Sequence, residues 1–151
     1  MKFPLFVTAA VVGLAVALPA AAQFRNAEAA VKYRQSVMQM QAYHFGRIAG
    51  MAGGRIPFDA KVAAEDAALL DTIDKLPFVA FVEGSDKAGN TRAKSEVWTN
   101  RAKFDAASVK LQEEAAKLNA AAKTGSLDAI KAAVPGVAGA CKACHDDFQA
   151  Q

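Results

Sequence analysis

The chain has 151 residues, 22% of them charged and 53% hydrophobic, and a formal net charge of +3. The basic residues form no cluster, so the sequence gives no support for nucleic-acid binding. The length suits a single domain built around one hydrophobic core.

Residues 1–22 have the features of a secretory signal peptide. A lysine at position 2 precedes an uncharged apolar run and three alanines that fit a small-residue cleavage site. A retained membrane anchor is the alternative, but the run is short for a membrane span and has no stop-transfer flank. We therefore expect cleavage near Ala22/Gln23, no stable membrane insertion, and a mature domain of residues 23–151 with 17 basic and 15 acidic residues.

The mature chain is rich in alanine, and its apolar residues recur at spacings of three and four, which is the helical period. A first helix is predicted from about Asn26 to Met51, where glycines break it. A second is predicted after Pro57, with Asp59 as its N-cap, ending at Leu76. The inward stripe of the first helix is expected to contain Val31, Gln35, Met38, Ala42 and Phe45.

The stretch between the second and third helices is expected to be a short apolar turn, 77–81, followed by a solvated loop, 83–91. The third helix is predicted from Ser95 to Lys123, with Gly125 as its C-terminal break. Apolar residues repeat along it every seven positions, with mostly small residues at the complementary positions, as in a bundle seam. These apolar residues are Val97, Phe104, Leu111 and Leu118.

The fourth helix begins after Ser126, its predicted N-cap. Apolar residues and both cysteines follow at alternating spacings of three and four, so Cys141 and Cys144 are expected to face the core. Because this period continues across Pro135, we predict a kink there rather than the end of the helix. Four such helices with short connections predict an all-α, antiparallel up-and-down four-helix bundle.

Cys141 to His145 form a Cys-x-x-Cys-His motif, which is the attachment signature of c-type haem. Thiols three residues apart lie on one edge of a helix and can reach both vinyl groups of a porphyrin, and His145 can reach the iron. A disulfide or a redox-active pair is an open alternative, although no βαβ pattern accompanies the motif. Zinc would need four ligands, and the only other Cys or His is His44.

The first helix is the expected wall on the other side of the haem. Gln35 and Met38 lie one turn apart, and the thioether of Met38 could bind iron or could simply fill the core. His44 lies off this stripe and is expected to be a structural histidine. Arg101 is expected to extend outward along its alkyl stem, the alternative being contact with a haem propionate.

Several segments together resemble the cytochrome c′ family, the class II c-type cytochromes. Val31–Gln35, Met38 and His44–Arg47 are similar to the family's first helix, and Glu96–Trp98 is similar to the helix start after its long loop. Cys141–Asp146 is similar to the haem-binding end. The resemblance spans the whole mature chain, with the segments in the family's order.

This resemblance implies that Cys141 and Cys144 hold one haem c covalently in the bundle core, with His145 as the proximal iron ligand. Met38 takes the distal position, where the family has a bulky residue that shields an unligated iron. Members are typically periplasmic homodimers with five-coordinate haem that bind nitric oxide or carbon monoxide, and they are described as electron-transfer proteins. The redox partner is not indicated.

The resemblance also places Arg34 and Gln35 at the haem edge, with Arg34 pairing with a propionate. Ser95 and Glu96 match the family's haem-contacting stretch. One departure is Gln149, four positions after the ligand histidine, where the family usually has a basic residue.

Two functional hypotheses follow: a gas-binding cytochrome c′, or a low-spin carrier of the cytochrome c-556 type with Met38 bonded to iron. An enzyme such as a peroxidase is disfavoured, because it needs a distal acid–base group and the inferred distal face contains only Met38 and Gln35.

Overall fold

The computed structural model describes residues 23–150, so the predicted signal peptide lies outside the described residues. The architecture is all-α, as predicted, and the only ladder pairing in this part of the chain is an isolated bridge between Ala93 and Gln149. The elements are the helices α1 (Ala27–Ala52), α2 (Ala60–Ile73), α3 (Glu96–Thr99), α4 (Arg101–Lys123) and α5 (Leu127–Phe148), and a 3₁₀ helix (Leu76–Ala80).

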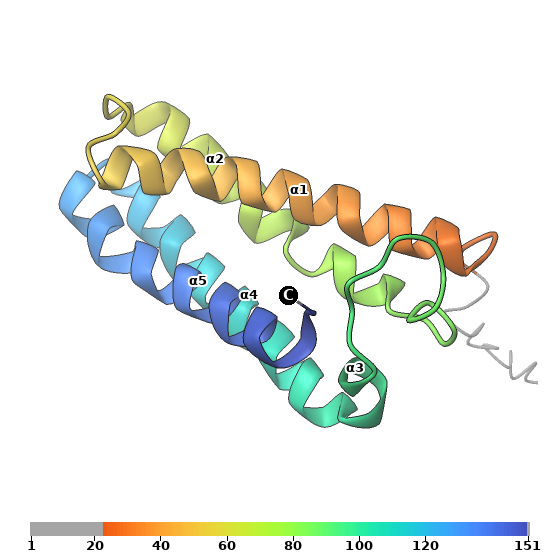
Figure 1. Cartoon of the computed structure of the whole chain (residues 1–151). Coiled ribbons are helices and arrows are strands. Elements are labelled where there is room, and N and C mark those ends of the chain that lie inside the picture. Colours follow the sequence, from red (N-terminus) through yellow and green to blue (C-terminus); the bar gives the residue numbers. More distant parts are fainter. Residues whose placement is uncertain (1–22, 151) are drawn as a thin grey trace, which may run out of the picture.

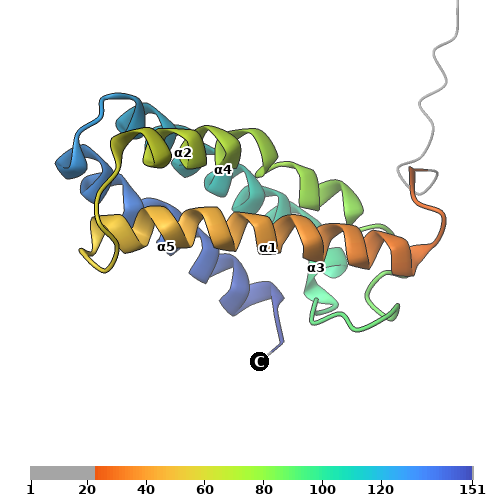
Figure 2. The same cartoon turned by 90° about the horizontal axis from the view of Figure 1, so that it is seen from above.

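The four long helices form the bundle shown in Figures 1 and 2. α1 packs against α2, α4 packs against α5, and contacts of α2 with α4 and of α1 with α5 close the bundle. A loop of residues 81–95, called the cavity loop below, joins the two pairs. It lies beside the N-terminal half of α1 and the C-terminal end of α5 (Figure 1).

Side-chain caps fix the starts of three long helices. Asn26, Asp59 and Ser126 each have an extended backbone, and each side chain accepts a hydrogen bond from the backbone N–H three residues later. The predicted caps Asp59 and Ser126 are therefore confirmed. α5 also continues through Pro135, as its unbroken period predicted.

The end of α2 differs from the prediction, because the helix stops at Ile73 rather than at Leu76. The N–H that would bond the Ile73 carbonyl in a longer helix belongs to residue 77, which is a proline and has no N–H. The Ile73 oxygen instead accepts a hydrogen bond from Gln41 Nε2, at 3.5 Å. The chain then tightens into the 3₁₀ helix.

The predicted third helix is also interrupted, at Asn100, where φ is −123° and ψ is 53°. It forms the single turn α3 and then the long helix α4. The predicted solvated loop was wrong at Ser85, which is completely buried. Its burial follows from a long-range contact with α1 that local sequence does not reveal.

The core has two parts. An aliphatic cluster, which includes Ile48, Leu70, Leu118 and Ile130, fills the end of the bundle near the α1–α2 and α4–α5 connections. An aromatic cluster surrounds Phe104, whose ring centroid lies 4.8 Å from that of Phe81, 5.3 Å from Phe148 and 5.7 Å from Phe78. These residues are C-terminal in α5 or near the cavity loop, so this cluster supports the region of the Cys-x-x-Cys-His motif.

α4 and α5 approach each other closely at Gly136. A β-carbon at this position would collide with the carboxylate of Glu114. Glu114 is itself held by Lys110 and Lys117, at 2.6 and 2.8 Å. Within residues 23–150, no helix has the length and apolar character needed to cross a bilayer.

Candidate functional site

A cavity of about 750 Å³ lies between the helix pairs. This volume falls in the range of about 300–1,000 Å³ found for cofactor sites. Most of its lining is apolar, with polar groups concentrated on α1, on the cavity loop and at the end of α5. The apolar part is Met38, Ala42, Phe45, Leu70, Phe78, Phe81, Ala93, Val97, Phe104, Leu111, Ala115, Val137 and Phe148.

Cys141 and Cys144 both line this cavity, one turn apart on α5, as the period of the helix predicted. Both are free thiols. Burial raises the pKa of Cys141, and burial together with the nearby Cys141 and Asp147 raises the pKa of Cys144 to about 11. A redox-active Cys-x-x-Cys pair has a lowered thiol pKa, so these neutral thiols do not fit that alternative.

His145 lies on the same wall and also borders the cavity. Its side chain is exposed and makes no hydrogen bond to the described part of the chain. The donor set on α5 is therefore two thiols and one free imidazole. That set matches two thioether linkages and one axial ligand of a c-type haem.

The opposite wall is formed by α1, and it contains both residues predicted there. Met38 is half-buried and packs against the aromatic cluster, and Gln35 borders the cavity. Gln35 Nε2 donates to the backbone oxygen of Asn90 in the cavity loop, at 2.7 Å. The sequence-based stripe through Gln35, Met38, Ala42 and Phe45 is thus brought together on one face of the cavity.

Arg34 borders the cavity as well, although its residue exposure is only 2%. Its Nη1 donates to the Ala80 oxygen and to Ser85 Oγ, at 3.0 and 2.7 Å. Its Nη2 donates to the Ser85 oxygen and to Thr91 Oγ1, both at 2.8 Å. These bonds hold the cavity loop against α1 and explain the burial of Ser85.

The buried charge of Arg34 has no carboxylate at ion-pair distance among the described residues. Burial lowers the pKa of Arg34 to about 10, and Asp86 opposes this effect only at longer range. A buried cation without a paired anion is costly. The cavity wall at Arg34 is therefore electrostatically suited to an anionic ligand group.

The cavity loop is also tied to the end of α5. The backbone N–H of Lys94 donates to the Phe148 oxygen and that of Ala150 to the Arg92 oxygen, at 2.9 and 2.8 Å. The Arg92 side chain donates twice more to the Ala150 oxygen. Arg92 lines the cavity, but no pattern in the sequence predicted this, because its position depends on the pairing of the loop with the end of α5.

Asp74 is a second cavity residue that sequence reasoning missed. It is the C-cap of α2 and is only 4% exposed. Its Oδ2 is buried and has no hydrogen-bond partner among residues 23–150. Burial, and then the neighbouring Asp71, raise the pKa of Asp74 to about 6, against the opposing effect of Lys75. Asp74 thus adds to the cavity an acidic group that the sequence analysis did not name.

Three other predicted residues lie apart from the cavity. Ser95 and Glu96 are exposed and do not line it, whereas Asn90 to Ala93 and Val97 do. His44 instead joins α1 to α2 through a contact of 2.7 Å between its Nδ1 and Asp66 Oδ1, as a structural histidine would. Gln149 does line the cavity, and its backbone N–H donates to the His145 oxygen.

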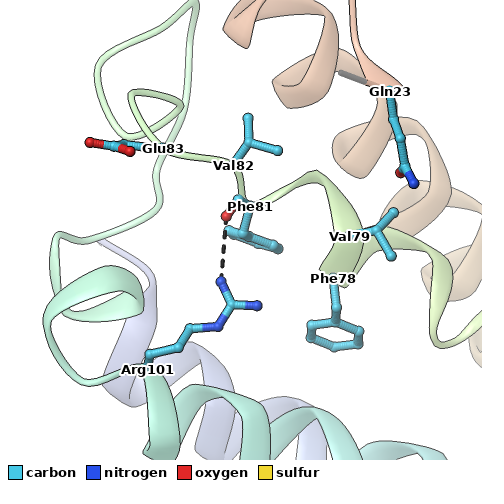
Figure 3. Close-up of a pocket in the computed structure, with 7 residues that line it drawn as sticks. All are labelled: Gln23, Phe78, Val79, Phe81, Val82, Glu83 and Arg101. Carbon is cyan, nitrogen blue, oxygen red and sulfur yellow. Dashed lines mark hydrogen bonds between the residues drawn. The ribbon is translucent and has the colours of Figure 1, made fainter. Parts of the chain in front are cut away.

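A second hollow, of about 440 Å³, shares the lining residues Phe78 and Phe81 with the larger cavity (Figure 3). Arg101 lines it and reaches toward the Phe81 oxygen, while its Nε pairs with Asp105 at 2.8 Å. Arg101 therefore extends outward, as expected. None of the described residues that line this hollow carries a thiol or an imidazole, so the donor set that could hold a haem lies at the larger cavity.

Comparisons with known proteins agree with this geometry. A family model described as cytochrome C′ matches residues 29–149. A cytochrome c′ from Rubrivivax gelatinosus is 52% identical over 127 residues, which are 84% of this chain and 98% of that relative. Its crystal structure has a TM-score of 0.82 and covers 85% of this chain and 100% of its own. A nitric oxide complex of a cytochrome c prime variant from Alcaligenes xylosoxidans is 38% identical, with a TM-score of 0.78, and the match covers 85% of this chain and 98% of that one.

Proposed function

Since the chain belongs to the cytochrome c′ family, we propose that it is an exported haem c protein that binds nitric oxide and carbon monoxide and transfers single electrons. The observation that carries this proposal is the pairing of the two cavity walls. Two thiols and a free imidazole on α5 face a wall of α1 whose central residue is the uncharged Met38.

Cys141 and Cys144 would hold one haem c through thioether bonds, and His145 would be its proximal iron ligand. Support comes from the shared orientation of all three side chains toward one cavity and from the absence of a competing bond to the imidazole in the described residues. The haem, once bound, supplies an iron that exchanges one electron and accepts a diatomic ligand.

The rim of the cavity carries two guanidinium groups that could meet the two propionates. Arg34 is buried without a paired anion, which favours a carboxylate nearby. Its four terminal N–H groups already bond Ala80 and the cavity loop, so a propionate would meet its Nε–H or share a donor. Arg92 is exposed at the same rim and adds a second positive charge.

The side of the haem facing α1 would be left without a protein ligand, giving five-coordinate iron. Met38, Phe78 and Phe81 supply apolar surface there, which admits small neutral molecules more readily than water or anions. Among related structures, a nitric oxide complex and a carbon monoxide-bound variant are known for the Alcaligenes xylosoxidans protein. These support gas binding rather than catalytic turnover as the role of this chain.

Export and assembly belong to the same proposal. Residues 1–22 would direct the chain to the periplasm and be removed, leaving the domain 23–151 to bind haem. A second copy would make a homodimer through α1 and α2, and Met40 and Tyr43 on α1 are exposed residues that such a contact could cover.

The second candidate is a low-spin electron carrier in which Met38 binds iron as the sixth ligand. The position of Met38 on the wall opposite His145 is the observation that favours it. A related protein from Cereibacter sphaeroides, 31% identical over 138 residues, is named cytochrome c-554. The two candidates differ in whether the iron has an open coordination position.

An absorption spectrum of the reduced, haem-loaded protein tests this proposal. We expect a high-spin spectrum that shifts when carbon monoxide is added, and the same resting spin state in Met38→Ala. A low-spin spectrum that is insensitive to carbon monoxide and becomes high-spin in Met38→Ala would replace the first candidate by the second. Met40→Ala, an exposed methionine of the same helix, is the matched control and should change neither spectrum.

A further inference from the structure

Asp74 is a buried carboxyl group that the proposed haem chemistry does not use. It caps α2, where its backbone N–H donates to the Leu70 oxygen at 2.9 Å, and its residue borders the same cavity as Met38 and His145. Its exposure is 4%, and its Oδ2 has no hydrogen-bond partner in the described part of the chain.

The surroundings of Asp74 disfavour a negative charge. An ionised carboxylate without a partner is costly away from water, and a carboxylate at a helix C-terminus also meets the negative end of the helix dipole. Asp71 adds a like charge one turn away, and only Lys75 opposes it. Consistent with this setting, the pKa of Asp74 is raised to about 6.

The helices packed against α2 bring no cation to balance Asp74. From α1, His44 and Arg47 are both bound to Asp66, and the side chain bonded to the residue before Asp74 is the neutral Gln41, which donates to the Ile73 oxygen. From α4, Leu111 and Ala115 line the cavity, Asn119 pairs with Asp71, and Glu114 is bound by Lys110 and Lys117. From α5, the titratable groups at the cavity are Cys141, Cys144 and His145. At the rim, Arg34 is bonded to the cavity loop and Arg92 to the Ala150 oxygen.

The remaining positive charge in this cavity would be that of the oxidised haem iron, which is lost when one electron is added. An oxidised haem therefore favours the ionised form of Asp74 more than a reduced haem does. A haem in the cavity also displaces water, which further increases the cost of an ionised but unbalanced Asp74. By linkage, electron binding and proton binding then strengthen each other.

We propose that Asp74 is a proton-binding site coupled to the redox state of the haem. As one electron enters the haem from a one-electron donor protein, the Asp74 carboxylate takes one proton from solvent and becomes a neutral carboxylic acid. No other bond forms or breaks, and the net charge of the cavity is unchanged. This inference rests on the proposed haem function and adds a proton to its electron transfer.

The reduction potential of the haem-loaded protein tests the coupling when it is measured from about pH 5 to about pH 8. Asp74 has one pKa in the oxidised protein and a higher pKa in the reduced protein. In the wild type we expect the reduction potential to fall as the pH rises from the first value to the second. In Asp74→Asn, which keeps the shape of the side chain but cannot ionise, this fall should be lost or greatly reduced. In the matched control Asp71→Asn the fall should remain, displaced to lower pH because Asp71 no longer raises the pKa of Asp74.

A second measurement reports the carboxyl group itself. The infrared difference spectrum of reduction should contain the carbonyl stretch of a newly protonated carboxyl, present in the wild type and in Asp71→Asn and absent in Asp74→Asn. An unchanged pH dependence in Asp74→Asn, or the persistence of that band, overturns the inference. The pyridine haemochrome spectrum is recorded on each sample, and a chain that carries no haem c overturns the proposed function together with this inference.

Discussion

The guanidinium of Arg34 lies over the ring of Phe81, with Cζ 4.4 Å from the ring centroid. This contact joins the polar and apolar parts of the cavity wall, since Arg34 also holds Ser85 and Thr91 and Phe81 packs on Phe104. Arg34 therefore makes more side-chain hydrogen bonds to the cavity loop than Gln35, which donates only to Asn90.

Replacing Arg34 should destabilise the whole domain. Arg34→Ala removes four hydrogen bonds and leaves the buried Ser85 and Ala80 oxygens without these donors, at a cost of roughly 2–4 kcal/mol in the free energy of unfolding. Urea unfolding of the haem-loaded protein, followed by circular dichroism, measures this change. Arg101→Ala is the control, because its pair with Asp105 is exposed and should contribute less than about 1 kcal/mol. Equal losses in the two variants would contradict the role given to Arg34.

Asp74 predicts an unusual dependence of stability on pH. Its folded-state pKa, about 6, is above the ordinary value of 3.8, so the folded protein binds this proton more tightly than the unfolded chain does. The contribution of the protonated Asp74 to the free energy of unfolding is therefore fully present below about pH 4 and is lost as pH rises through 6. Above that pH the free energy of unfolding is lower by roughly 3 kcal/mol than at pH 4. Asp74→Asn should raise the melting temperature at pH 8 and change it little at pH 4. Equal effects at both pH values would show that the ionised carboxylate is not the cause.

The contact between Gly136 and Glu114 predicts a difference between two glycines of α5. Gly139→Ala should stabilise the protein by about 0.5–1 kcal/mol, because alanine favours the helix and a β-carbon there meets nothing within 4 Å. Gly136→Ala should stabilise the protein less than Gly139→Ala does, or should destabilise it. The reason is that the new β-carbon displaces the Glu114 carboxylate from Lys110 and Lys117. Chemical denaturation of both variants measures the difference, and identical gains would mean that Glu114 moves away freely.

Gln149 offers a test of charge at the histidine side of the cavity. Gln149→Arg should raise the reduction potential and Gln149→Glu should lower it, because a positive charge near the cavity favours the added electron. At an effective dielectric constant of 20, two charges about 15 Å apart interact by roughly 1 kcal/mol, so each shift should be of this order or smaller. Spectroelectrochemical titration measures both shifts, and movement in the same direction would indicate a structural rather than an electrostatic effect.

Local sequence signals predicted most of the helices and the cavity-lining residues of α1 and α5. The caps Asp59 and Ser126 and the continuous period across Pro135 depend on neighbouring residues, so they could be recognised without a structure. The inward direction of Cys141 and Cys144 followed from the same period.

The lining contributed by the end of α2 and by the cavity loop depended on contacts that sequence position does not encode. Asp74 is a polar residue within the predicted second helix, and its burial at the cavity depends on the packing of other elements around it. Arg92 lines the cavity through the pairing of the loop with residues 148–150. For the same reason Ser95 and Glu96, which the family resemblance had placed at the haem, do not line the cavity. Residues 90–93 line it instead.

The pairing of residues 92–94 with residues 148–150 also has a consequence for maturation. If the chain is exported as proposed, its N-terminus crosses the membrane first and residues 148–150 cross last. The pairing that fixes the cavity loop would then form only after Cys141 and Cys144 have crossed, so that haem attachment and the closing of the fold would coincide.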